Sequence, residues 1–388
     1  GNLAITGTVS ANGNYITPYT GVKNRIINGA MMIDQRNAGA SVTIGSVNGL
    51  YTLDRYTWYT SQASKLSTQQ SSTAPTGFTK SMLITSLSAY TPVSGDYFFF
   101  RQGIEGFNIA DLAWGTANAQ TVTLSFWVRS SLTGTFGGHI LSSNSAYAYV
   151  YSYTINSANT WEQKTITIPG PTTGTFNTDN TAGTYVSFTL ASARTVASTG
   201  WQTVGTGADA VTGSVNLTAT SGATWYITGV QLELGSVATP FESRLYGHEL
   251  QLCQRYFETT YNPGTAVGTA TGTGMVVSGI YVNGWPGGVV ASHSFKQSKR
   301  ATPTITTYDS AGTSGGYSWY SWASDPGASG FNTSGVGSIS SASQNNIRST
   351  GYGVAGTSSS IFFHYTASAE LDRKSTRLNS SHVSESRM

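Results

Sequence analysis

The stretch TWYITGVQLELGSVATPFESRLYGHELQLCQRYF, residues 224–257, contains two hydrophobic periods in succession. In its first part, residues 225–234, apolar and polar side chains alternate, so that Val230 and Leu232 fall on one face and Gln231 on the other. A period of two predicts a half-buried β-strand. A glycine and then a proline follow, and the strand should end there because proline cannot donate a hydrogen bond to a sheet.

The second part of this stretch has the period of a helix. Leu250, Cys253 and Phe257 recur at i, i+3 and i+7, which predicts a short amphipathic helix over Gly247–Glu258. Cys253 is the one cysteine, so the chain has no internal disulfide, and its place among the apolar positions favours a small buried hydrophobe over a reactive thiol. Because the helix lies between two regions rich in Gly, Ser and Thr, we interpret it as the joint between two domains.

The composition favours strands throughout the rest of the chain. Only 10% of the 388 residues are charged, whereas the chain holds 45 glycines, 22 tyrosines and 9 tryptophans. Aromatic residues suit pleated sheets and glycines suit the turns between strands. The formal charge of +3 is small and scattered, which argues against a nucleic-acid partner. No apolar run is long enough to insert into a membrane. We therefore predict an all-β protein.

The predicted order is a stalk remnant at 1–23, a jelly-roll β-sandwich at 24–243, a helical joint at 244–261, a second, Gly-rich distal β domain at 262–371, and a non-native tail at 372–388. The tail sequence DRKSTRLNSSH resembles a common sequencing adapter translated in one frame, so we leave it out of the fold. Alternation predicts sandwich strands over 51–58, 97–102, 121–129, 147–155, 164–168, 184–190 and 215–219, and a helical turn within 104–112. The glycines at 134, 137 and 138 are interpreted as connections.

Several long motifs carry a family resemblance. They are NRIINGAMMIDQRN, YTLDRYTW, ADLAWGTANAQTVTLSFWVRSSLTGTFGG, NTWEQKTITIPGPTTGTF and WYITGVQLELGSVATPFESR followed by ELQLCQRYF. In this order they resemble bacteriophage tail-fibre and virion proteins whose body is a carbohydrate-binding-module-like jelly roll, over residues 24–257. The segment FKQSKRATPTITTYDSAGTSGG resembles the distal domains of the same family. The resemblance implies a virion tail fibre, outside the host cell, that binds a host-surface glycan, contacts other tail proteins and forms a homotrimer.

Aromatic residues in the distal domain are the candidate carbohydrate-binding site. In GGYSWYSW, residues 315–322, alternation places Tyr317 and Trp319 on one strand face and Tyr320 and Trp322 on the other. Trp285 lies between two turn signals. Exposed rings of this kind stack on the C–H faces of sugars. The alternative is that these rings fill the core or a subunit interface, which would make the chain a purely structural spacer.

No catalytic motif stands out, and we expect the chain not to be an enzyme. No histidine has metal-ligand spacing, and neither a nucleophile elbow nor a P-loop is present. A glycoside hydrolase, or polysaccharide depolymerase, needs only two carboxylates that meet in the fold, and Asp34, Asp54, Glu105 and Asp111 are the first candidates.

Two groups of charged or polar residues have alternative interpretations. Arg36, Asp54 and Arg55 are either ligand contacts or structural pairs near a strand end. The oxygen-rich loop Asn177-Thr178-Asp179-Asn180 suits either a structural calcium ion near Asp179 or an Asx turn. No other cofactor is expected.

Overall fold

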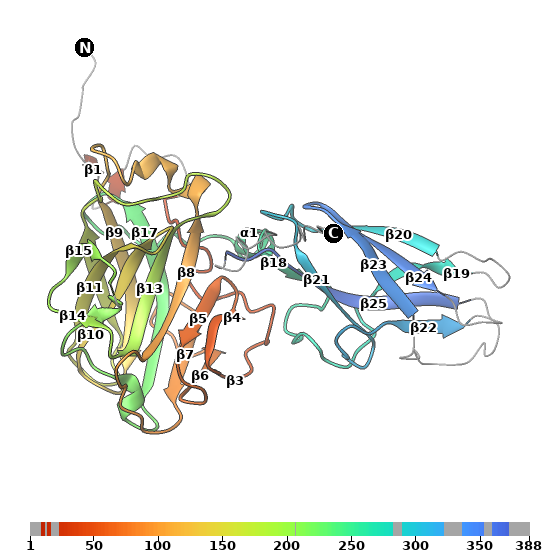
Figure 1. Cartoon of the computed structure of the whole chain (residues 1–388), viewed down its shortest axis with the longest axis horizontal. Helices are drawn as coiled ribbons and strands as arrows, with labels where there is room; N and C mark the ends of the chain where they lie inside the picture. Colours follow the sequence, from red (N-terminus) through yellow and green to blue (C-terminus); the bar gives the residue numbers. More distant parts are fainter. Residues whose placement is uncertain are drawn as a thin grey trace, which may run out of the picture.

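Two β-rich bodies make up the molecule, with a short helix between them (Figure 1). The computed structural model describes residues 9–11, 14–16, 23–205, 207–281, 289–321, 336–352 and 359–371. Trp285, Trp322 and the tail at 372–388 lie outside the described residues, as do the side chain of Tyr320 and most of the segment 1–22.

The first body is a sandwich of two antiparallel sheets. The seven-stranded sheet has the order β15 (Gly200–Thr203), β11 (Tyr147–Ile155), β10 (Gly134–Ser142), β13 (Ala182–Ser192), β8 (Tyr97–Glu105), β5 (Tyr56–Thr60), β4 (Val47–Leu53). The six-stranded sheet has the order β12 (Glu162–Ile168), β9 (Val122–Ser130), β17 (Thr224–Leu234), β7 (Ser81–Ser86), β6 (Leu66–Ser71), β3 (Val42–Thr43). The predicted all-β fold with a jelly-roll sandwich is confirmed.

The core of the sandwich lies between the two sheets. Along β8, Phe98 and Phe100 point into this core, while Phe99 between them belongs to the outer face of the seven-stranded sheet. Trp58 of β5 and Trp225 of β17 meet the same cluster from opposite sheets, and both are 0% exposed. Because successive side chains of a strand point to opposite faces, the aromatic residues of β8 lie alternately in the core and on the outer face of the sheet.

The second body carries the distal strands. Its larger sheet contains β18 (Phe257–Thr259), β25 (Ser359–Ser368) and β19 (Val276–Tyr281), and β21 (Thr304–Tyr308) and β22 (Ser318–Ser321) also pair with β25. Its smaller sheet has the order β20 (Val289–Ser294), β24 (Asn346–Tyr352), β23 (Val336–Ala342). Phe363 and Tyr365 of β25 lie in the core of this body.

Short elements complete the described chain. They are β1 (Val9–Ala11), β2 (Asn14–Ile16), β14 (Thr195–Val196), β16 (Ala210–Val211), the 3-10 turns η1 (Gly106–Asn108), η2 (Ala110–Leu112) and η3 (Leu217–Ala219), and the helix α1 (Tyr246–Gln254). The predicted helical turn within 104–112 is confirmed by η1 and η2. Cys253 is buried, as predicted.

The bounds or type of three predicted helices and strands are wrong. The helix ends at Gln254, because Phe257–Thr259 instead forms β18 and pairs with β25. The predicted strand 51–58 is a hairpin that turns at Asp54-Arg55, where Arg55 has a φ of 74°. The predicted strand 215–219 contains η3, closed by i+3 hydrogen bonds to the carbonyls of Asn216 and Leu217.

The end of the described chain returns to the sandwich. Glu370 accepts hydrogen bonds from the guanidinium groups of Arg55 and Arg36. Glu105 of β8 pairs with Arg255 and also accepts the Tyr256 hydroxyl, 2.7 Å away. The structural alternative for Arg36 and Arg55 is therefore confirmed, and this part of the outer sheet face, which we call the covered end, is occupied by protein.

Candidate functional site

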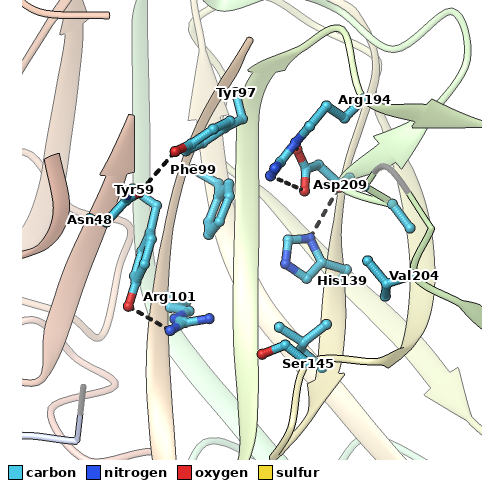
Figure 2. A pocket seen from close by; sticks show the side chains of 13 residues that line it. Asn48, Tyr59, Tyr97, Phe99, Arg101, His139, Ser145, Arg194, Val204 and Asp209 are labelled. Carbon is cyan, nitrogen blue, oxygen red and sulfur yellow. Dashed lines mark hydrogen bonds and ion pairs between the residues drawn. The ribbon is translucent and has the colours of Figure 1, made fainter. Parts of the chain in front are cut away.

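The other end of the same sheet face contains a cavity of about 330 Å³, which we call the sheet-face cleft (Figure 2). It is lined by Asn48, Tyr59, Tyr97, Phe99, Arg101, His139, Leu141, Ser145, Arg194, Val204, Gly207, Ala208 and Asp209. A volume of this size is at the lower limit for a small-molecule site.

Strand register assembles this cleft from separate segments. Tyr59 of β5 lies opposite Phe99 of β8, and Phe99 lies opposite Thr189 of β13. In the next row Arg101 lies opposite Ser187, which in turn lies opposite His139 of β10. The small side chains of β13 thus separate the large residues of β8 from His139. Larger side chains on β13 would fill this part of the sheet face, whereas the small ones leave a hollow.

Strand β10 requires glycine to reach this position. A Cβ atom on Gly138 would lie 2.1 Å from the carbonyl oxygen of Ser187 and 2.5 Å from the Tyr151 hydroxyl oxygen. Only a residue without a side chain lets the strands approach so closely. The interpretation of the glycines at 134, 137 and 138 as connections is therefore wrong: all three belong to β10, and the last two place the next residue, His139, in the cleft.

Aromatic rings form a continuous row along the cleft. Tyr59 stacks on Phe99 with ring centroids 5.3 Å apart and an interplanar angle of 7°. Phe99 also meets the His139 ring edge to face at 5.1 Å, and Tyr97 is tilted against Phe99 at 5.8 Å. Tyr97 is half-buried, and its hydroxyl donates to Asn48 Oδ1 at 3.0 Å. The row offers apolar ring surface with polar edges.

Two arginines and one aspartate carry the charge of the cleft. Arg194 donates two hydrogen bonds to Asp209, at 2.7 and 2.8 Å, and its guanidinium lies 4.0 Å from the Tyr97 ring centroid. Arg101 lies 4.0 Å from the Tyr59 ring centroid and donates to the Tyr59 hydroxyl at 2.5 Å. Figure 2 shows these two arginines on opposite sides of Phe99.

His139 supplies a neutral polar group. Burial lowers the pKa of His139, and the positive charges of Arg101 and Arg194 act in the same direction, whereas Asp209 opposes them. The Nδ1 atom lies 3.3 Å from the carbonyl oxygen of Asp209, to which it donates in the Nδ1-protonated tautomer. At neutral pH the ring therefore acts as a hydrogen-bonding group without charge.

The predicted distal rings lie in different surroundings. Tyr317 is 6% exposed and packs against Phe363 in the distal core, with ring centroids 5.3 Å apart. It is therefore not available to a sugar, because its ring packs inward just before β22 begins. Trp319 is half-buried and packs against the same core. Trp285, Trp322 and the Tyr320 side chain lie outside the described residues, so that part of the predicted site stays a prediction.

The four candidate carboxylates lie apart from the cleft and have protein partners. Asp34 accepts backbone hydrogen bonds within its own turn, and Asp54 is buried and accepts one hydrogen bond from the backbone N–H of Gln35 and one from its side-chain amide. Glu105 belongs to the covered end, and Asp111 pairs with Arg25 near η2.

The oxygen-rich loop forms an Asx turn. Asp179 Oδ1 accepts the backbone N–H of Thr181 at 2.9 Å and also accepts its hydroxyl. Within the described ranges, no three His, Cys, Asp or Glu side chains gather as they would around a metal ion. The calcium alternative for Asp179 thus has no further support.

Comparisons with known proteins give fold-level neighbours only. No family model and no curated protein matches the chain. Among solved structures, the enzymatically active domain of tailspike protein 4 from bacteriophage CBA120 aligns at 14% identity with a TM-score of 0.29, over 55% of this chain and 21% of that one. A family 11 carbohydrate-binding module from Clostridium thermocellum, in complex with a mixed-linked tetrasaccharide, aligns at 17% with a TM-score of 0.26, over 51% and 98%.

A third neighbour is a xylan-binding domain from Paenibacillus barcinonensis, at 9% identity with a TM-score of 0.24, over 52% of this chain and 99% of that domain. Similarity at this level does not indicate which ligand this chain binds. The chemistry of the cleft therefore follows from its own residues. In the part of the chain described, no helix is both long and apolar enough to cross a membrane.

Sequence reasoning did not identify the cleft. Its residues come from positions between 48 and 209, and only strand register brings them together. One signal was available: in YFFFRQ, residues 97–102, bulky rings occupy both faces of a strand and an arginine follows on the outer face. A strand with rings on both faces indicates that its outer face is covered or binds something.

Proposed function

We propose that this chain is a segment of a phage tail fibre that binds a host-surface glycan in the sheet-face cleft, without cutting it. The observation that carries the proposal is the row of Tyr97, Phe99 and Tyr59 beside Arg101 and His139 in one cavity. Ring faces take the apolar C–H surface of a sugar, while buried donors and acceptors fix its hydroxyls.

The tail-fibre role rests on the sequence resemblance over residues 24–257. We further propose that the fibre is a homotrimer on the virion, outside the host cell, in contact with other tail proteins. A small cleft binds one glycan weakly, and several copies held together raise the apparent affinity by avidity. Light scattering on residues 24–371 tests the trimer separately: a mass of three chains supports it, and a stable monomer contradicts it.

The glycan site is tested with a glycan array and three variants of the full chain. Tyr97→Ala removes the half-buried ring of the cleft, and we expect binding to weaken by about ten-fold or more. Trp161→Ala is the matched control, because Trp161 is a half-buried ring that contacts Tyr226 on the other sheet. Trp319→Ala tests the distal rings.

Three outcomes contradict the cleft as the glycan site. They are binding of no glycan by the wild-type chain, unchanged binding by Tyr97→Ala, and loss of binding in Trp319→Ala alone. Release of oligosaccharide from a bound polymer would contradict the non-enzymatic part and favour the depolymerase. If the chain binds no glycan but forms trimers, the structural spacer is favoured.

A further inference from the structure

Arg101 is one of three buried arginines among the described residues, with Arg55 and Arg300, and its guanidinium has the fewest acceptors of the three. It is 2% exposed. Arg55 forms an ion pair with Glu370, and Arg300 donates to the backbone carbonyls of Ala369, Asn180 and Glu370. No ion pair and no backbone acceptor is found for Arg101 in the described ranges. A buried cation without a counter-charge is costly unless something else stabilises it.

Aromatic rings supply part of that stabilisation. The guanidinium carbon of Arg101 lies 4.0 Å from the ring centroid of Tyr59 and 3.8 Å from that of Tyr185. Stacking of this kind is favourable, but it leaves the in-plane N–H groups without acceptors. Among the described residues, the Tyr59 hydroxyl is the acceptor found for Arg101. The Nε atom is buried and has no partner there.

A second orphan polar atom lines the same cavity. Ser145 Oγ is buried without a hydrogen-bond partner among the described residues. Ser187, which lies opposite Arg101 in register, has a buried and unpartnered hydroxyl as well. Buried polar atoms are normally satisfied, so two such atoms on residues that line one cavity, with a third on the strand beside it, indicate a ligand that supplies acceptors.

The charges of the cleft point to the sign of that ligand. Arg194 is neutralised by Asp209, and the lowered pKa of His139 keeps its ring neutral near pH 7. Arg101 therefore leaves the cleft with one uncompensated positive charge. A guanidinium presents a planar fork of donors that matches the two oxygens of a carboxylate.

We propose that the sheet-face cleft selects a sugar that carries a carboxylate, such as a hexuronate or a sialic-type residue, and that Arg101 binds this carboxylate. The inference rests on the proposed function and names the class of glycan. Tyr59 and Tyr185 hold the guanidinium in place, and Ser145 is available to a neighbouring hydroxyl of the sugar. Neutral sugars would leave the buried charge of Arg101 unpaired.

The test compares acidic sugars with their neutral parents. Galacturonate, glucuronate, mannuronate and N-acetylneuraminate are titrated into the full chain by ligand-detected NMR, beside galactose, glucose, mannose and the methyl ester of N-acetylneuraminate. We expect at least one acid to bind about ten-fold or more tightly than its neutral parent. Raising the salt concentration should reduce that preference. Inorganic sulfate is included as a competitor, to separate recognition of a sugar acid from recognition of any anion.

Arg101→Met should reduce binding of the acid to the level of the neutral sugar. Arg129→Met is the matched control, because Arg129 is half-buried and stacks on Tyr226 on the other sheet. Arg101→Lys retains the charge but loses the planar fork, so it tests the idea if the methionine variant does not fold.

The outcomes separate the two proposals. Binding of neutral sugars as tightly as acids overturns the acidic class but leaves the glycan site intact. Retention of the acid preference by both Arg101 variants also overturns it, as does displacement of the acid by equimolar sulfate. Binding of neither class in the cleft overturns the glycan site itself.

Discussion

The two ends of one sheet face treat buried charge in opposite ways. Along β8, Arg101 faces the open cleft, Gly103 lies beneath Leu371 of the distal body, and Glu105 pairs with Arg255. At the covered end Arg55 pairs with Glu370 and Glu105 pairs with Arg255, and the buried Arg300 donates to three backbone carbonyls. At the open end one cation lacks such a partner. A paired buried charge is typical of an interface, whereas an unpaired one beside a cavity indicates a binding site.

The largest expected effect comes from unpairing the covered end. Glu370→Gln should lower the free energy of unfolding by about 3–5 kcal/mol, because Arg55 then becomes a buried charge without its carboxylate. Denaturant titration of the full chain measures this. Asp111→Asn is the control: its ion pair with Arg25 has an aspartate side chain 46% exposed, and the expected loss is about 0–1 kcal/mol. Equal losses would show that burial does not distinguish the two pairs.

A pH dependence should appear at the hairpin that leads into the covered end. Burial raises the pKa of Asp54 to about 6, against the opposing effects of Arg36 and Gln35. The pKa of this side chain in the unfolded chain is about 3.9. Between about pH 3.9 and 6, the folded protein therefore holds a proton that the unfolded chain has released. Stability from this residue is therefore present below about pH 4 and lost as pH rises to about 6, by roughly 3 kcal/mol.

The Asp54→Asn variant isolates that effect. We expect the free energy of unfolding of this variant, minus that of the wild type, to increase as pH rises from 4 to 7. Denaturant titration of both proteins at four pH values in this range measures the difference. Parallel stability curves for the two proteins would mean that Asp54 has no shifted pKa in the folded state.

The smallest effect concerns the strand that carries His139. Gly138→Ala should cost about 1–3 kcal/mol of stability and weaken glycan binding, because the added methyl group meets the Ser187 carbonyl and β10 has to move. Gly247→Ala is the control in α1, where an added Cβ meets nothing within 4 Å. It should stabilise the chain by about 0.5–1 kcal/mol. A Gly138→Ala variant as stable as the wild type would contradict the close approach of β10 to β13 at this position.

The sequence predicted those parts of the fold that depend on local alternation. The strand predicted at 147–155 coincides with β11, and the one at 225–234 differs from β17 by one residue at its start. The sequence does not predict the hairpin turn at Asp54-Arg55. Arg55 has a left-handed backbone conformation there, and its side chain is held by Glu370, more than 300 residues away in the sequence. Long-range contacts of this kind leave no local signal.

The cleft could not be predicted for a related reason. The glycine-rich sequence around His139 is typical of a turn, and only its packing against Ser187 and Tyr151 makes it a strand. The sequence instead predicts a binding site at residues 315–322, because four aromatic residues lie close together there. Whether an arginine is paired depends on which strands lie beside it, so the difference between Arg101 and Arg55 emerges only from the assembled sheets.

The most direct measurement is a crystal structure of the full chain with the sugar acid that binds most tightly. We predict that the sugar lies in the sheet-face cleft against Tyr97, with its carboxylate within hydrogen-bonding distance of Arg101. A sugar bound instead on the distal body, with an empty cleft beside an unchanged Arg101, would contradict the assignment of the binding site to the open end of the sheet.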